Sequence, residues 1–185
     1  TFSVEDPGPV TLQNNTGCPI SYQIRLRVRD DCCGWSIPVF ATVTVEPPIT
    51  NNTINAPAFT SFCTSGNPGN ITGSFPAGGI CSYTYQWQQS INGGVFTNIA
   101  GATAQSYDPP NLSAIGTYQY IRIVSSSVCG SSTSNVVTIN VYAPPTVAPI
   151  GGTVCAGQTL QLFGNALPGS GSIVSHQWSG PGAAY

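Results

Sequence analysis

Residues 83–88 read Tyr-Thr-Tyr-Gln-Trp-Gln, and this stretch alternates large apolar side chains with polar ones. A period of two places successive side chains on opposite faces of a strand, so one face is expected to meet a core. Residues 22–28, 39–45 and 137–141 alternate in the same way. No segment keeps the helical period of about 3.6 residues. The sequence therefore predicts an all-β fold of antiparallel strands packed as a sandwich.

The composition suits short strands and tight turns. Hydrophobic residues make up 41% of the 185 residues, charged residues make up only 5%, and there are 21 glycines and 16 prolines. Thr and aromatic residues favour the pleated sheet, whereas Gly, Pro and Asn supply turn geometry. The net charge is −2, without a basic patch that could neutralise phosphates, so we expect no nucleic-acid partner. We also expect no membrane span in this segment, because no apolar run approaches about 18 residues.

The seven cysteines favour disulfides and an oxidising compartment. They form no Cys-x-x-Cys pair, and the single histidine is His176, so metal-finger spacing is absent. Reduced thiols in the cytosol are the alternative. The first residues do not form a signal peptide, so an export signal is expected outside this chain.

An internal repeat divides the chain into three parts. The Pro-Pro pairs at 47–48 and 144–145 lie 97 residues apart, about the length of one sandwich domain. Tyr22-Gln23 and Tyr118-Gln119 precede these pairs, and the spacing from Cys63 to Trp87 is nearly that from Cys155 to Trp178. We therefore expect the back half of a module at 1–48, a complete module at 49–145 and the front half of a further module at 146–185. The proline pairs are expected to act as stiff linkers.

The middle module has an immunoglobulin-like order. Trp87 matches the core Trp of strand C, a Gly-rich turn follows it, and Tyr118 matches the tyrosine corner at the start of strand F. The antibody-type core cysteine would fall near Tyr120, so that disulfide is absent. We expect Trp87, Tyr118 and, in the third part, Trp178 to be core residues.

The repeats resemble the immunoglobulin-like repeats of giant secreted surface adhesins of Bacteroidota, including those of gliding flavobacteria. The matching motifs are Cys155-Ala156-Gly157, Tyr85-Gln86-Trp87, Gly93-Gly94, Gly101-Ala102-Thr103, Tyr107, Leu112, Thr117-Tyr118, Cys129 and Val137-Thr138-Ile139. The resemblance implies tandem immunoglobulin-like modules, export by the type IX route and an extracellular or cell-surface location. It implies a structural or adhesive segment of a bacterial surface adhesin or filament, which extends a stalk and presents loops. An accessory carbohydrate-binding module of a secreted enzyme is the alternative.

The sequence offers no catalytic constellation. His176 matches Tyr85 in the repeat, which favours a strand position over a catalytic base. Asp30-Asp31 is the only acidic cluster outside the first residues, and its setting favours a turn over a calcium site. We expect no enzymatic activity, no cofactor and no metal.

A candidate ligand surface lies near the first turn. Arg25, Arg27 and Arg29 form a stripe on one strand face, able to bind anionic surface glycans by bidentate contacts, and Trp35 could stack on a sugar ring. The alternatives are a solvated face for the arginines and a core-capping role for Trp35.

The repeat alignment pairs Cys63 with Cys129, and Cys81 with Cys129 is the alternative. Cys155 is expected to bond a partner outside its own half-module, as is Cys32 or Cys33. The two half-modules lead to a further expectation, because a front half without its last strands leaves an open sheet edge. We expect 146–185 to be completed by a segment equivalent to 1–46, from the next repeat or from a neighbouring subunit.

Overall fold

The structure is a computed structural model that describes residues 8–16, 18–79 and 82–180. Within these residues all regular structure is β, and no helix occurs. The strands are β1 (Ile20–Leu26), β2 (Val39–Val45), β3 (Ile54–Asn55), β4 (Ser61–Cys63), β5 (Thr72–Gly73), β6 (Tyr83–Ile91), β7 (Thr97–Asn98), β8 (Gly116–Ser126), β9 (Gly130–Thr133) and β10 (Val137–Tyr142). The predicted all-β class is confirmed.

A six-stranded sheet forms the centre of the molecule. Its order is β4-β10-β8-β6-β7, with β9 also paired to β8. All its pairings are antiparallel except that of β4 with β10. The short pair β3–β5 forms a second small sheet, and β1–β2 forms a separate two-stranded hairpin. The long strands β6 and β8 pair along nine residues and hold the module together.

The core of the central module lies between β3–β5 and the large sheet. Trp87, Tyr118, Tyr120 and Ile139 come from the large sheet, and Ile54 comes from β3; all are buried in one cluster. The indole N–H of Trp87 donates to the carbonyl of Ala104 at 2.9 Å, which satisfies its polar atom inside the core. The alternating pattern of β6, β8 and β10 therefore directs one face inward, as strand geometry requires.

Two tight corners fix the ends of the long strands. After β6, Asn92 and Gly93 adopt φ angles of 52° and 76°, the left-handed conformation that suits Asn and Gly in a hairpin turn. Before β8, the hydroxyl of Tyr118 donates to the carbonyl of Ala114 at 2.8 Å. The Asn92 side chain joins these corners, because its Oδ1 accepts a hydrogen bond from the Thr117 N–H at 2.8 Å.

The β1–β2 hairpin has the same strand register as β8–β10. Tyr22 lies opposite Val43, and Tyr118 lies opposite Ile139. Adding 96 to both residue numbers of a β1–β2 pair gives the β8–β10 pair, from Ile20–Val45 to Ile24–Ala41. Tyr22 also anchors to an upstream carbonyl, that of Gln13 at 2.9 Å.

Residues 143–180 form no strand, although two isolated bridges order them. Thr146 pairs with Leu167, and Ile150 pairs with Phe163. The first bridge has a counterpart in the central module, where Thr50 pairs with Ala77. In both cases a segment just after a Pro-Pro pair meets a segment beyond the next cysteine.

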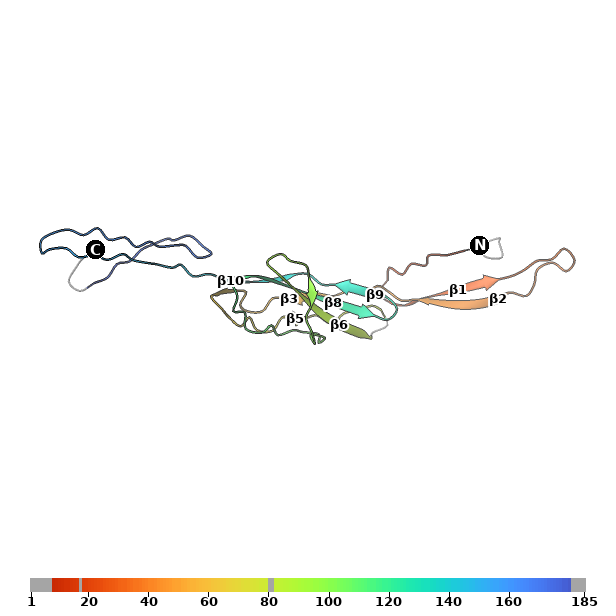
Figure 1. Cartoon of the computed structure of the whole chain (residues 1–185). Coiled ribbons are helices and arrows are strands. Elements are labelled where there is room, and N and C mark those ends of the chain that lie inside the picture. Colours follow the sequence, from red (N-terminus) through yellow and green to blue (C-terminus); the bar gives the residue numbers. More distant parts are fainter. Residues whose placement is uncertain (1–7, 17, 80–81, 181–185) are drawn as a thin grey trace.

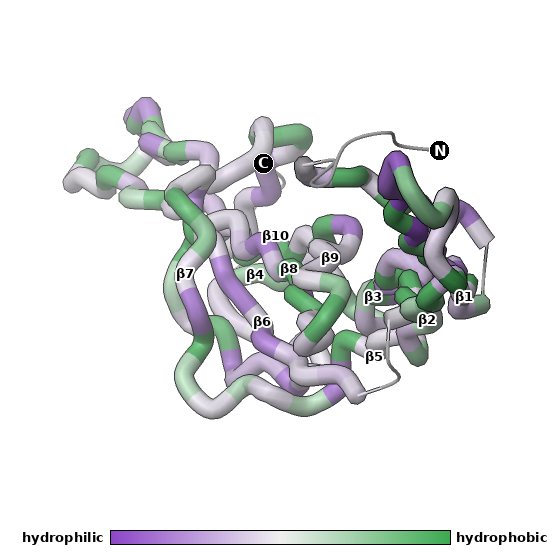
Figure 2. The backbone as a smooth tube through the Cα atoms, turned by 90° about the vertical axis from the view of Figure 1, so that its right-hand side faces the viewer, coloured by the Kyte–Doolittle hydropathy of each residue, from purple (hydrophilic) through white to green (hydrophobic). Residues whose placement is uncertain are grey.

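Figure 1 shows an elongated molecule. The β1–β2 hairpin and the segment after β10 extend from opposite ends of the central module. Figure 2 colours the backbone by hydropathy and shows strongly hydrophobic residues in β8 and in the β1–β2 hairpin alike. In β8 these residues are covered, whereas in the hairpin they are largely exposed.

Candidate functional site

The loop between β1 and β2 brings together three of the four predicted ligand residues. Beyond the end of β1 the two arms of this loop stay close to each other. Arg29 and Trp35 form an antiparallel bridge, and the Ser36 N–H donates to the Val28 carbonyl at 2.7 Å. The guanidinium carbon of Arg27 lies 5.4 Å from the centre of the Trp35 ring, and that of Arg29 lies 6.0 Å from it. Both distances are within the range of cation–π contacts. We call Arg27, Arg29 and Trp35 the tip cluster.

The tip cluster is exposed. Trp35 keeps 58% of its surface accessible, so it does not cap a core. Arg27 donates one N–H to the Ser36 carbonyl at 3.2 Å, which fixes the side chain beside the indole. Arg25 lies on the same face of β1 but opposite Phe40, outside the cluster. Two cations beside an exposed indole can bind a carboxylate or sulfate while a sugar ring packs on the aromatic surface.

Asp30 has a structural part in this loop. Its Oδ1 accepts hydrogen bonds from the N–H groups of Cys33 at 2.6 Å and Gly34 at 3.1 Å. Gly34 adopts φ 81°, which closes the turn. Asp30 therefore supports the turn interpretation. Within the described part of the chain, no group of three His, Cys, Asp or Glu residues is placed to hold a metal ion.

His176 lies exposed in the segment after β10, outside any strand. The strand position expected from the repeat is not formed there. Trp178, expected in a core, is 41% exposed, and its ring lies beside Gly164 of the same segment, where a Cβ would touch it. The physical reason is the same for both residues: residues 143–180 form no sheet, whereas Trp87 lies on β6 of the large sheet and packs in the core of the central module.

Arg122 is the polar residue that the sequence analysis missed. It is fully buried on β8, among the apolar side chains of the core. Its guanidinium donates to Asn52 Oδ1 at 2.9 and 3.1 Å, to the Gln105 carbonyl at 2.8 Å and to the Ser74 carbonyl at 3.0 Å. We call Arg122 with these three acceptor residues the arginine clasp.

The clasp joins the large sheet to the smaller one. Asn52 precedes β3 and Ser74 follows β5, so one cation links both strands of the β3–β5 pair, at the same end, to β8. Burial lowers the pKa of Arg122 from its ordinary value, while the neighbouring Tyr85, whose ring centre lies 5.2 Å away, acts in the opposite direction. An arginine stays protonated in proteins, so the clasp is a buried cation held by neutral oxygens. The signal in the sequence was an Arg that shares the inward face of its strand with Tyr118, Tyr120 and Val124.

Tyr120 lies in the same core, and its hydroxyl does not act as an acid or a base. Burial raises the pKa of its hydroxyl well above the ordinary value, and the neighbouring Tyr107 and Tyr118 add to the shift. The phenol therefore stays neutral across the physiological pH range. Its ring packs 5.9 Å from the Tyr107 ring, which is an ordinary core contact.

The predicted Cys63–Cys129 disulfide is wrong for this fold. Both cysteines are free in the structure. Cys63 lies opposite Tyr142, at the Gly116 end of β8, whereas Cys129 lies in the turn after Ser126, at the other end. The eleven residues of β8 span roughly 35 Å at about 3.3 Å per residue, but a disulfide needs Cα atoms within about 7 Å. The parallel pairing of β4 with β10 is the physical reason for this separation.

The other cysteine predictions remain open. Cys81, in the alternative pair with Cys129, lies outside the described residues. Cys32, Cys33 and Cys155 are free and exposed, and so accessible to partners outside their own segments.

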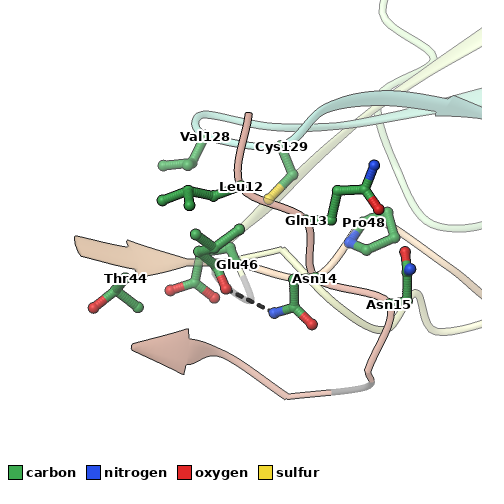
Figure 3. Close-up of a pocket in the computed structure, with 10 residues that line it drawn as sticks. Leu12, Gln13, Asn14, Asn15, Thr44, Glu46, Pro48, Val128 and Cys129 are labelled. Atoms are coloured by element: carbon green, nitrogen blue, oxygen red, sulfur yellow. Dashed lines mark hydrogen bonds between the residues drawn. The ribbon is translucent and has the colours of Figure 1, made fainter. Parts of the chain in front are cut away.

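An open pocket lies where the hairpin joins the central module. Figure 3 shows Leu12 and Asn14 beside the end of β2, with Val128 and Cys129 of the β8–β9 turn facing them. The Asn14 amide donates to the carbonyls of Val45 at 2.7 Å and Cys18 at 2.8 Å, and its Oδ1 accepts from Thr16. Asn14 is thereby fully bonded, so this pocket is best understood as a junction between segments.

A family model described as a domain of unknown function (DUF8696) matches residues 50–143. These residues coincide with the central module, from just before β3 to just after β10. No curated protein matches the chain. Among the described residues, no helix is long and apolar enough to cross a membrane.

Proposed function

Because the chain belongs to the DUF8696 family, whose function is not assigned, we propose a function from its own residues and geometry. We propose that it is a non-catalytic structural and adhesive repeat segment of a large bacterial surface adhesin or extracellular filament. It extends a stalk and presents loops. This proposal rests on the identical strand registers of β1–β2 and β8–β10, because the same pairing of two strands occurs twice in one chain.

The proposal includes a modular architecture. Residues 49–145 form an immunoglobulin-like sandwich, with Trp87 in the role of the strand C tryptophan and Tyr118 as the tyrosine corner. The Tyr118 bond to the Ala114 carbonyl supports that role. Residues 1–48 and 146–185 are the back half and the front half of further modules. An elongated molecule, with its hairpin and last segment at opposite ends, suits a repeat that lengthens a stalk.

The proposed location is the cell surface, with export by the type IX route. The resemblance to Bacteroidota adhesin repeats and the cysteine-rich, charge-poor composition support this location. The proposed partners are neighbouring repeats or subunits of the same protein, together with surface glycans.

The tip cluster favours a second candidate, an accessory carbohydrate-binding module of a secreted enzyme. Guanidinium groups beside an exposed indole are suited to anionic sugars. The two candidates differ in what surrounds the chain in the native protein. Further modules of the same kind support the repeat, and a neighbouring catalytic domain supports the accessory module.

An antibody raised against the purified chain tests the proposed location. We expect it to label intact source cells, and we expect protease treatment of those cells to remove the label. A permeabilised sample, probed for a cytosolic enzyme, controls for leakage. Labelling that appears only after permeabilisation would overturn the proposal of a surface protein.

A further inference from the structure

The segments that join the proposed modules are bonded to the chain that follows them. We call residues 47–50 the first linker and residues 143–146 the second linker. In the first, Thr50 and Ala77 exchange two backbone hydrogen bonds, of 2.8 and 3.0 Å. The Gly79 N–H donates to the carbonyl of Pro47 at 2.9 Å. The first linker is therefore a bonded part of the central module and not a free spacer.

The second linker repeats these bonds. Thr146 and Leu167 exchange two backbone hydrogen bonds, of 3.0 and 2.8 Å, and the Ser170 N–H donates to the carbonyl of Ala143 at 3.0 Å. The two linkers lie 96 positions apart, the interval that also relates the β1–β2 ladder to the β8–β10 ladder. Both junctions lie inside the described part of the chain, so the same bonding is observed twice.

A glycine lies at close range to the backbone of each linker. A Cβ on Gly78 would collide with the carbonyl oxygen of Pro48, and a Cβ on Gly169 would collide with that of Ala143. Backbone cannot swing aside as the end of a long side chain can, so glycine is the residue that fits at both places. Gly78 has φ 78°, and its carbonyl accepts a hydrogen bond from the Tyr83 hydroxyl at the start of β6. This contact ties the first linker to the large sheet.

Almost no chain is left between the last strand of one module and the linker of the next. Val45 ends β2, where it pairs with Ile20. Only Glu46 separates Val45 from Pro47, and Tyr142 at the end of β10 is followed directly by the second linker. Each residue has two soft torsions, while proline fixes one of its own and restricts the residue before it. Few torsions therefore remain that could reorient one module against its neighbour.

We propose that these glycine-clamped linkers are rigid joints that hold each module at a fixed orientation to the one before it. Flexible linkers behave as coils and would shorten a stalk, whereas clamped linkers preserve the elongated arrangement of the chain (Figure 1). This inference rests on the proposed repeat function and specifies how the stalk keeps its direction.

Amide hydrogen exchange, followed residue by residue by NMR, tests the clamp in the full chain. Gly78→Ala should release the first linker, so the amides of Thr50 and Gly79 should exchange at least about tenfold faster while those of β6 stay unchanged. Gly101→Ala is the matched control, because Gly101 has φ 73° and a Cβ there meets no atom within 4 Å. It carries the same left-handed strain without the collision and should leave both amides unchanged. Equal effects of the two variants overturn the proposal.

The second linker gives an independent test without left-handed strain. Neither Gly169 nor Gly171 has a left-handed φ, and a Cβ would collide with the backbone only at position 169. The Ala143 N–H donates to Ser170 Oγ at 2.7 Å. Gly169→Ala should make this amide exchange at least about tenfold faster, and Gly171→Ala should leave it unchanged. A Gly171→Ala effect as large as that of Gly169→Ala overturns the clamp.

Residual dipolar couplings of the full chain test the orientation itself. Amides of β1–β2 and of the central module should fit one common alignment. Inserting Gly-Gly between Glu46 and Pro47 keeps the clamp but adds free torsions, so the couplings of β1–β2 should collapse while those of β6 and β8 persist. Couplings of β1–β2 that are already as small in the native chain as in the insertion variant overturn the rigid joint. That result leaves the repeat function standing, because surface labelling of intact cells tests it separately.

Discussion

At the scale of single residues, the arginine clasp is the most demanding feature of the molecule. A buried cation without an anionic partner is stable only where several acceptors replace its water shell. Asn52, Gln105 and Ser74 supply these acceptors from three separate segments. Gly73 leaves room for the guanidinium, because a Cβ at that position would collide with Arg122. The clasp therefore fixes how the smaller sheet sits on the larger one.

Replacing Arg122 by Met should destabilise the central module by about 3 kcal/mol, because the buried acceptors lose their donor. Urea unfolding followed by circular dichroism and Trp fluorescence measures this change. Arg29→Met removes an exposed arginine with little burial and should change stability by less than about 0.5 kcal/mol. If the two variants are equally stable, the clasp is not a stabilising element.

Arg122 also shows what sequence analysis misses at this scale. The alternating apolar pattern places residue 122 inward, yet an arginine there favours a solvated position on composition alone. Its acceptors near β3–β5 are the side-chain oxygen of Asn52 and the backbone carbonyl of Ser74. The third acceptor is the backbone carbonyl of Gln105, in the loop between β7 and β8. These positions are far apart in the sequence, so nothing local predicts their meeting.

At the scale of elements, the alternation of apolar and polar residues predicted strand positions where the strands are long. The predicted strands near β1, β2, β6 and β10 are present, with β1 ending at Leu26, two residues before the predicted end. The strands β3, β5 and β7 have two residues each, which is too short to display a period of two. Their positions depend on tertiary packing.

The hairpin also carries the prediction for ligand binding. Immobilised sulfated or carboxylated polysaccharide should retain the chain, and retention should fall with added salt because exposed charges are screened. Arg27→Gln with Arg29→Gln should lower affinity at least about tenfold, since two charge-assisted contacts are lost. Trp35→Ala should also lower it.

The matched control is Arg122→Gln, which removes an arginine from the core and none from the surface. At temperatures where that variant stays folded, its retention should equal that of the native chain. Retention that is unchanged in the double tip variant would show that the tip cluster does not bind these polysaccharides.

At the scale of the whole molecule, cysteine pairing could not be obtained from the repeat. The repeat alignment paired Cys63 with Cys129 because cysteines recur at both positions. Whether two cysteines can form a disulfide, however, depends on which end of the sheet each of them lies at. The parallel pairing of β4 with β10 is a property of sheet order and places Cys63 far from the β8–β9 turn. The sheet order needed the structure.

The same arrangement predicts three regions of different local stability. Backbone amides of β6, β8 and β10 lie in a sheet with a buried core, so hydrogen exchange there should need global unfolding. A two-stranded hairpin without a covered face is only marginally stable in water, so β1 and β2 should exchange faster in dilute solution. The segment 146–180 has only isolated bridges, so its amides should exchange fastest. Hydrogen-exchange mass spectrometry of the dilute chain measures this order. Protection in β1 and β2 as high as that in β6 would contradict it, because the hairpin has no covered face.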